Sequence, residues 1–241
     1  MEVSSGSGSI HGARIDVFRR ENEGVISNEQ VVASSEITVK KWTDLKDELR
    51  KLLDTRGHAS AEATFKRICL IDDFTASGST MVRYENNKWK GKLHRFCSAI
   101  LPHVGQFIAK RALIHVHHYL GTEKAEAKID ELVSAYGKEV SNFQFLISFS
   151  HVLSGDVVVD DAADEKLVSL IKSHYDKSIE KNSHLGVDVW YGYGQCGLPV
   201  VLDHNSPNNS IALIWARGEH ADAMRPLFPR KQRHVQHGQS V

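Results

Sequence analysis

The sequence has 241 residues, with 41% hydrophobic and 25% charged side chains, which is typical of a globular protein of one domain with additions. Its 30 basic side chains match its 30 acidic ones, so the composition excludes a strong overall attraction to nucleic acid. No apolar run is long enough for a membrane span, the first residues show no signal-peptide pattern, and the 3 cysteines are far apart in the chain. We therefore expect a cytoplasmic protein with reduced thiols and no membrane contact.

The chain begins with a Gly/Ser-rich stretch, residues 1–9, for which two interpretations are open. It is either a flexible tail or a loop of small residues that binds an anion ahead of a helix. That helix is predicted over residues 10–22, with Ser9 as its N-cap. Only Met1 to Val3 remain for a strand before the loop, so the strand is either very short or part of a chain that extends further upstream.

The next part of the chain contains one clear element. Residues 23–42 are ambiguous between short strands and a helix–strand unit. Residues 43–54 predict an amphipathic helix, which Thr43 caps and Gly57 ends. Its buried stripe consists of leucines at helical spacing: Leu45, Leu49, Leu52 and Leu53.

The central stretch of the chain begins with four apolar residues, Ile68 to Ile71, which run directly into the acidic pair Asp72 and Asp73. An unbroken apolar run before a turn predicts a buried central strand of a parallel sheet. Ligands of such sheets bind at the carboxyl ends of the strands. The acidic pair and the residues after it are therefore placed where a ligand is expected.

A small, hydroxyl-rich loop follows the acidic pair, and we expect it to open a helix that continues to about residue 85. Small residues let backbone amides approach an anion, a helix start adds a positive dipole end, and hydroxyls add further donors. Such a loop suits one phosphate, and two adjacent carboxylates suit a vicinal diol or a hydrated magnesium ion. Together they suit a ribose 5-phosphate. The loop consists of Ala76, Ser77, Gly78, Ser79 and Thr80.

The acidic pair and the loop resemble the phosphoribosyl diphosphate loop of the type I phosphoribosyltransferases. The resemblance implies that Asp72 and Asp73 hold the ribose hydroxyls, with Mg²⁺ as cofactor, and that residues 76–80 wrap the 5-phosphate. Phe74 and Thr75 stand where the family prefers aliphatic residues, which indicates a divergent branch. The alternative is a strand that ends in an acidic turn before an ordinary capped helix.

The same family has its pyrophosphate loop between the first core strand and the first core helix. Residues 4–9 occupy that position in this sequence, with Arg14 nearby. The resemblance therefore implies a pyrophosphate site formed by Ser5, Gly6, Ser7 and Arg14. The flexible tail remains the alternative.

Downstream of the loop, strands and helices alternate. Residues 84–111 are predicted to be a helical insertion, and the order of the remaining elements predicts right-handed βαβ units. The fold class is therefore α/β, with a Rossmann-like, doubly wound and mainly parallel sheet, as in type I phosphoribosyltransferases. The predicted strands are 112–120 and 143–150, and the predicted helices are 92–101, 103–110, 123–136 and 164–177.

Two histidines, His115 and His117, share one face of a predicted strand. A metal pair is conceivable, but the sequence places no third ligand beside them. Ordinary strand histidines are the preferred interpretation.

The last informative stretch, residues 190–215, combines aromatic rings with a polar turn after a predicted strand at Val200–Leu202. Its Asn-x-Pro-Asn-Asn segment resembles effector phosphoribosyltransferases of bacterial conflict systems, including retron-linked ones. The resemblance implies a hood that reads a base through Asn205, Asn208, Asn209 and Trp190. The alternative is a hairpin turn rich in Asn and Pro. We place the core at residues 1–185 and the hood with a basic tail at residues 186–241.

The resemblance implies a pentosyltransferase that binds phosphoribosyl diphosphate or a nucleotide 5′-phosphate and acts at the ribose anomeric carbon. It further implies an antiphage effector with a protein or nucleic-acid partner in a defence complex, and oligomers are compatible with it. Two alternatives belong to other classes. One is a non-catalytic sensor that binds a nucleotide, and the other is a toxin–antitoxin partner with a vestigial pocket.

Overall fold

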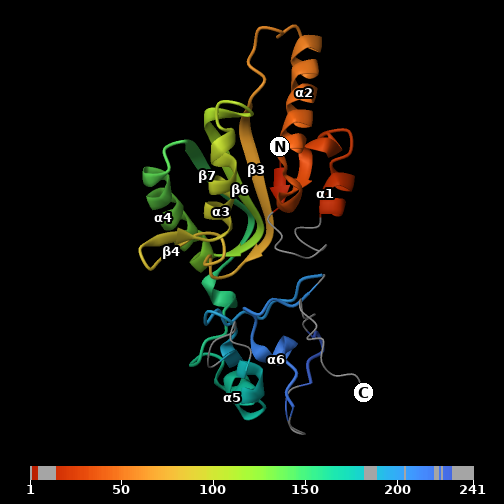
Figure 1. The fold of residues 1–241 in the computed structure, drawn as a ribbon. Coiled ribbons are helices and arrows are strands. Elements are labelled where there is room, and N and C mark those ends of the chain that lie inside the picture. The colour runs from red at the N-terminus through yellow and green to blue at the C-terminus, as the bar shows by residue number, and fades with distance from the viewer. Residues whose placement is uncertain are drawn as a thin grey trace. The chain divides into compact units, whose positions relative to one another are not determined.

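The computed structural model describes residues 2–4, 15–181, 189–203, 205–219, 223 and 225–229. The chain divides into two compact units, Met1–Val152 and Leu153–Val241 (Figure 1). The division therefore lies earlier than the predicted boundary at residue 185, because the helix after residue 164 packs within the second unit. Of the helices that the structure describes, none has the length and apolar character needed to span a lipid bilayer.

The first unit is built on a five-stranded sheet of order β2-β1-β3-β6-β7. The pairs β1–β2, β1–β3 and β3–β6 are parallel, and contacts between β6 and β7 advance together along both strands, as in a parallel pair. This architecture confirms the α/β class with a Rossmann-like, mainly parallel sheet. The strands are β1 (Glu2–Ser4), β2 (Val31–Ala33), β3 (Phe65–Thr75), β6 (Ile108–Thr122) and β7 (Phe143–Leu153).

Two helices lie near the β2 edge of the sheet, α1 (Ile15–Glu21) and α2 (Val39–Thr55) (Figure 1). Helix α2 begins four residues before the predicted start, because Thr38 rather than Thr43 caps it and accepts a hydrogen bond from Lys41 N. The missed first turn supplies Trp42, which is buried against Phe65 and Phe107.

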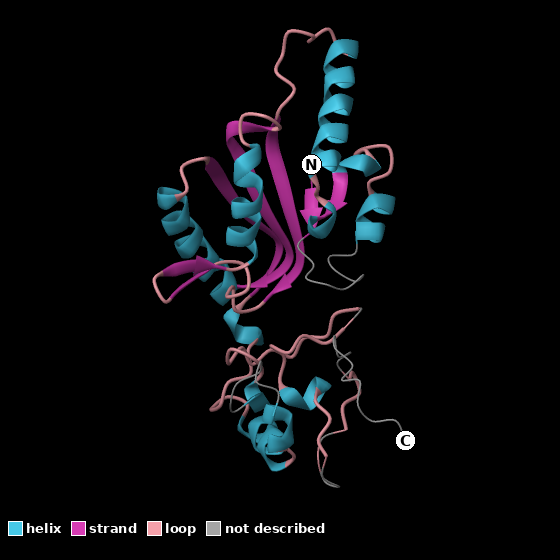
Figure 2. Ribbon diagram, in the orientation of Figure 1, coloured by secondary structure: helices cyan, strands magenta, loops and turns pink. Residues whose placement is uncertain are grey.

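The helices α3 (Lys92–Ile100) and α4 (Glu123–Glu139) lie beside the sheet (Figure 2). They supply most of the helical side of the hydrophobic core. Alternate residues of β3 and β6 face this core, as the period of a strand requires. The core includes Ile68, Leu70, Ile114 and Val116 from the strands and Leu93, Phe96, Ile129 and Val133 from the helices. Helix α4 begins at Glu123, as predicted, and Thr122 is its N-cap.

The segment after the loop differs from the prediction. Residues 77–91, all of which the structure describes, contain no helix but a hairpin of β4 (Arg83–Glu85) and β5 (Lys88–Lys90). Asn86 and Asn87 form its turn with positive φ angles of 53° and 58°, which Asn tolerates better than most residues. The second helix expected over 103–110 is also absent, because a short 3-10 turn leads into β6 at Ile108.

The second unit consists of short helices and turns around its own two apolar clusters. Helix α5 (Glu165–Ser173) packs Val168 and Ile171 against Val159 and Ile211, and α6 (Ala212–Trp215) packs near Val189. The strand predicted at Val200–Leu202 is wrong. In its place the structure has isolated bridges, Leu198 with Ser210 and Leu202 with Asn205.

Candidate functional site

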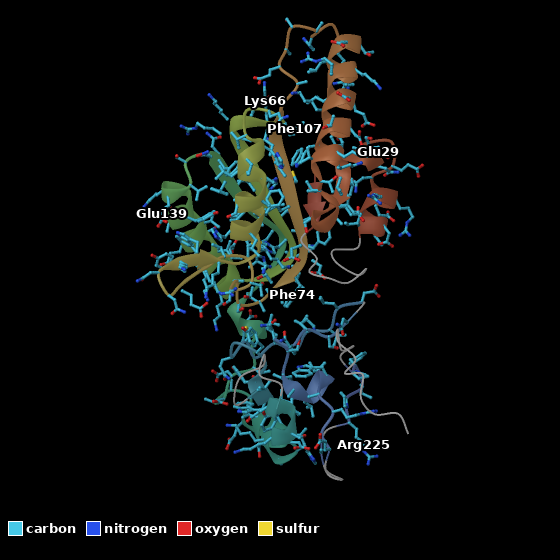
Figure 3. The ribbon with its side chains drawn as sticks, in the orientation of Figure 1. Glu29, Lys66, Phe74, Phe107, Glu139 and Arg225 are labelled. Carbon is cyan, nitrogen blue, oxygen red and sulfur yellow. The ribbon has the colours of Figure 1, made fainter. Side chains whose placement is uncertain are left out.

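The predicted phosphate loop follows the middle strand of the sheet. The strand order reverses direction between β1 and β3, which is the topological switch point where ligands of open α/β sheets bind. Figure 3 labels Lys66 and Phe74 near opposite ends of β3, and the loop begins just beyond the Phe74 end. Residues 76–80 therefore lie at the carboxyl end of β3, as predicted from the sequence.

Asp72 is a buried member of β3 rather than a turn residue. Its Oδ2 accepts a hydrogen bond from Lys92 Nζ at 2.6 Å, and Lys92 is the first residue of α3. Burial raises the pKa of Asp72, and the positive charge of Lys92 offsets part of that rise. The carboxylate thus has a partner within the protein.

Asp73 is half-buried and points to the other face of the sheet, because successive residues of a strand alternate. Its Oδ1 accepts a hydrogen bond from Phe74 N at 2.9 Å. The two carboxylates therefore project to opposite faces of β3. Asp73 is the more exposed of the two carboxylates, and carboxylate oxygens are ligands that a hydrated magnesium ion accepts.

A buried histidine lies beside the Asp72–Lys92 pair. His118 of β6 is the register partner of Asp72, is fully buried and stacks on Phe149 with ring centroids 5.1 Å apart. Neither of its ring nitrogens has a hydrogen-bond partner among the described residues. Burial above all, and then the nearby charge of Lys92, lowers the pKa of His118 to about 3.

The loop is seated on the start of α4. Thr122 Oγ1 donates a hydrogen bond to Ala76 O at 2.7 Å and accepts one from Ala125 N at 3.1 Å, so one hydroxyl fixes the loop and caps the helix. Gly78 has a positive φ of 68°, and a Cβ atom there would lie 3.1 Å from Ile129 Cγ1. Only glycine fits this conformation and this close approach without strain.

Basic side chains surround the hydroxyl end of the loop. Lys128 Nζ of α4 donates to Ser79 Oγ at 3.0 Å, and Arg83 Nη1 of β4 donates to Ser79 O at 3.2 Å. Together with Lys92 they bring three cationic side chains to the loop or to the strand that precedes it. An anion is the ligand that such a loop favours electrostatically.

The hairpin returns the chain to the loop before α3 starts. Lys92 N donates to Thr80 O at 2.9 Å, and Leu93 N donates to Met81 O at 3.0 Å. The helix expected directly after the loop is therefore replaced by the hairpin, and α3 begins only at Lys92. The first two backbone N–H groups of α3 are bound to the carbonyls of Thr80 and Met81, so part of the positive end of the α3 dipole is already used within the protein.

Sequence reasoning did not identify Lys92, Lys128, Arg83 or Thr122 as site residues. Lys128 and Ser79 are 49 positions apart, and Thr122 and Ala76 are 46 apart, so only the βαβ topology brings them together. The Thr122 cap was a usable signal, since the cap of the next helix lies at the same edge of a parallel sheet as the loop.

The predicted pyrophosphate residues Ser5, Gly6, Ser7 and Arg14 lie outside the described residues. Strand β1 ends at Ser4 and α1 begins at Ile15, so the stretch does connect the first core strand with a helix. The very short first strand is thus part of the sheet, between β2 and β3.

The predicted base-binding residues lie in the second unit, where the side chains of Asn205 and Asn209 hydrogen-bond to other residues of that unit. Asn209 Nδ2 donates to Tyr193 O at 2.9 Å, and Asn205 Oδ1 accepts from Ser206 N at 3.0 Å. Asn208 forms no side-chain hydrogen bond with the described residues, although its carbonyl accepts from Tyr193 N. Lys172 Nζ lies 4.4 Å from the ring centroid of Trp190, so one face of that ring already contacts a cation.

Comparison with known proteins places this site in a family. No match was found among curated proteins or among solved structures. The family model PRTase-CE matches residues 22–230, a range that includes the acidic pair, the loop and most of the second unit. The chain therefore belongs to the PRTase-CE family, which is of the phosphoribosyltransferase type.

Proposed function

We propose that the protein is a phosphoribosyltransferase-like enzyme that binds phosphoribosyl diphosphate or a nucleotide 5′-phosphate at the loop of residues 76–80. The observation that carries the proposal is the position of this loop. It follows the middle strand at the switch point, carries small and hydroxyl residues, and is contacted by Lys128 and Arg83. The family supports a phosphoribosyl ligand for such a loop.

The proposed reaction breaks the bond from the anomeric carbon either to an oxygen of the diphosphate or to a nitrogen of the base. The bonding electron pair leaves with that diphosphate or base. A nucleophile of the acceptor then forms the new bond to the same carbon. The transition state is cationic at the ribose, so positioning and negative charge are the main requirements. Asp73, half-buried beside the loop, is the proposed carboxylate for the ribose side.

Magnesium is proposed as a companion of the substrate diphosphate, whose charge it would neutralise. Asp73 is the more exposed member of the acidic pair, whereas Asp72 is buried and bound to Lys92, so Asp73 is the proposed outer carboxylate ligand. Asn205, Asn208, Asn209 and Trp190 are proposed to read the base, and Ser5, Gly6, Ser7 and Arg14 to bind pyrophosphate. A role as a cytoplasmic antiphage effector follows from the resemblance described above.

Two experiments test the proposal, each with phosphoribosyl diphosphate and each with and without magnesium. Titration calorimetry measures binding, and a pyrophosphate-release assay in the presence of a metabolite extract measures turnover. Asp73→Asn keeps the acceptor oxygen for Phe74 N but removes the charge, so it should abolish release while the fold persists. Asp54→Asn, at an exposed position near the end of α2, is the matched control. Release by Asp73→Asn at the parent's rate would contradict the proposed role of Asp73.

A second candidate is a non-catalytic nucleotide sensor, and the Asp72–Lys92 pair favours it. A carboxylate that is bound to a lysine inside the protein is less available to a substrate diol. Binding of phosphoribosyl diphosphate or of a nucleotide without release of pyrophosphate or base, under every acceptor tested, would select the sensor over the enzyme.

A further inference from the structure

Lys128 reaches the loop from a helix that lies far from it in the sequence. It is the sixth residue of α4, it is half-buried, and its Nζ lies 3.0 Å from Ser79 Oγ. The Ser79 hydroxyl in turn donates a weaker bond to Ser77 O at 3.4 Å. The lysine ammonium thus ends beside the hydroxyl part of the loop.

The three cations near the loop differ in what already neutralises them. Lys92 is bound to Asp72 at 2.6 Å, and Arg83 lies 3.5 Å from Glu85. Lys128 forms no ion pair with any carboxylate in the part of the chain that the structure describes. Its charge is the one at this loop that the described residues leave uncompensated.

The position of Lys128 is fixed by the same contacts that hold the loop. Gly78 packs against Ala125 and Ile129 of α4, and Thr122 bonds both the loop and the helix start. The loop and the first two turns of α4 therefore form one packed structure. An ammonium group on that part of the helix is preorganised toward whatever the loop binds, so less freedom is lost on binding.

We propose that Lys128 is a phosphate-binding residue that contacts the phosphate group held by residues 76–80. This inference rests on the proposed function and adds a residue from outside the predicted loop. An ammonium group has three donors, of which Ser79 Oγ takes one, so two remain for phosphate oxygens. Charge-assisted bonds to phosphate are about twice as strong as neutral ones.

The test is calorimetric titration of the full chain with ribose 5-phosphate, which carries this phosphate but no diphosphate. Lys128→Met keeps the length of the side chain and removes its charge, and we expect its affinity to fall by about tenfold or more. Lys128→Arg should recover part of the loss. Lys138→Met is the control, since Lys138 is exposed in the same helix, about 15 Å further along its axis.

The outcomes separate the two proposals. Loss of affinity in Lys128→Met, with Lys138→Met unchanged and with the parent's melting temperature, supports a phosphate contact. Equal affinities of Lys128→Met and the parent would overturn this inference and leave the loop as the phosphate site. A parent chain that binds neither ribose 5-phosphate nor phosphoribosyl diphosphate would overturn the proposed function, and the role of Lys128 with it.

Discussion

At the scale of residues, charge burial dominates the site. Asp72 and Lys92 form the least exposed ion pair among the described residues, with side chains 10% and 22% exposed. Removing one partner of such a pair leaves the other charge buried without compensation, which costs more than the pair itself contributes. The acidic residue that resembles a substrate ligand is therefore also a structural residue.

We expect Asp72→Asn to lower the free energy of unfolding by about 3–5 kcal/mol, because Lys92 would stay charged and partly buried. The double variant Asp72→Asn with Lys92→Met should lose less than the sum of the single variants. Urea unfolding of the four proteins measures this. The exposed pair of Lys41 and Glu29 supplies the control, where Lys41→Met should cost at most about 1 kcal/mol. An equally small cost for Asp72→Asn would show that the buried pair is not structural.

The buried His118 predicts a specific pH dependence. Its pKa in the folded chain, about 3, lies below the ordinary value of 6.5, so protonation favours the unfolded chain. The stability that this histidine contributes is present above pH 6.5 and is lost as the pH falls toward 3. His118→Phe, which retains a ring beside Phe149, should reduce the loss of stability between pH 7 and pH 5 by about 2 kcal/mol. An equal loss of unfolding free energy between pH 7 and pH 5 in the parent and the variant would contradict the assignment of this pH dependence to His118.

At the scale of elements, the hydroxyl of Thr122 links the loop to the start of α4. Thr122 caps the helix and also binds Ala76 O, whereas Thr38 only caps α2. Thr38→Val should therefore cost about 1 kcal/mol, and Thr122→Val about 2–3 kcal/mol, because a buried carbonyl loses its donor as well. Thermal unfolding gives both values, and ribose 5-phosphate titration should show weaker binding only for Thr122→Val. Equal costs for the two variants would mean that the bond to the loop contributes nothing measurable.

The sequence predicted elements well where the signal was local and continuous. The apolar run from Ile68 gave β3, and alternating β-rich residues gave β6, although both strands extend beyond the predicted ends. The helix expected at residue 77 was wrong because the Asn86–Asn87 turn closes a hairpin before α3 begins. The loop itself could be predicted from its small residues and its place after the strand.

Other parts of the site depend on packing that no local pattern encodes. Asp72 and Lys92 are 20 positions apart, with a hairpin between them, so their pairing follows from where α3 returns to the sheet. The opposite directions of Asp72 and Asp73 follow from β3 continuing to Thr75, four residues beyond the apolar run that ends at Ile71. A strand end that is misplaced by a few residues changes which side chains share a face.

At the scale of the whole molecule, the two units have separate cores, and each holds part of the predicted site. The phosphate loop belongs to the first unit, and the predicted base-binding residues belong to the second. In the second unit the stretches 190–197 and 208–210 are joined by Tyr193 N to Asn208 O and by Asn209 Nδ2 to Tyr193 O. These contacts give the polar turn a defined shape of its own.

Asn208 and Asn209 separate a structural role of this turn from a role in base recognition. Asn209→Ala removes the bond to Tyr193 O and should lower the free energy of unfolding by about 1 kcal/mol. Asn208→Ala removes a side chain that makes no hydrogen bond to the described residues, so the melting temperature should stay near that of the parent. If the second unit reads the base, Asn208→Ala should change which base is accepted and leave ribose 5-phosphate binding unchanged, because a site that hydrogen-bonds a ligand edge discriminates by those bonds. Pyrophosphate release with a panel of purine and pyrimidine bases measures this preference. A lower melting temperature with an unchanged base preference would assign Asn208 to the turn alone.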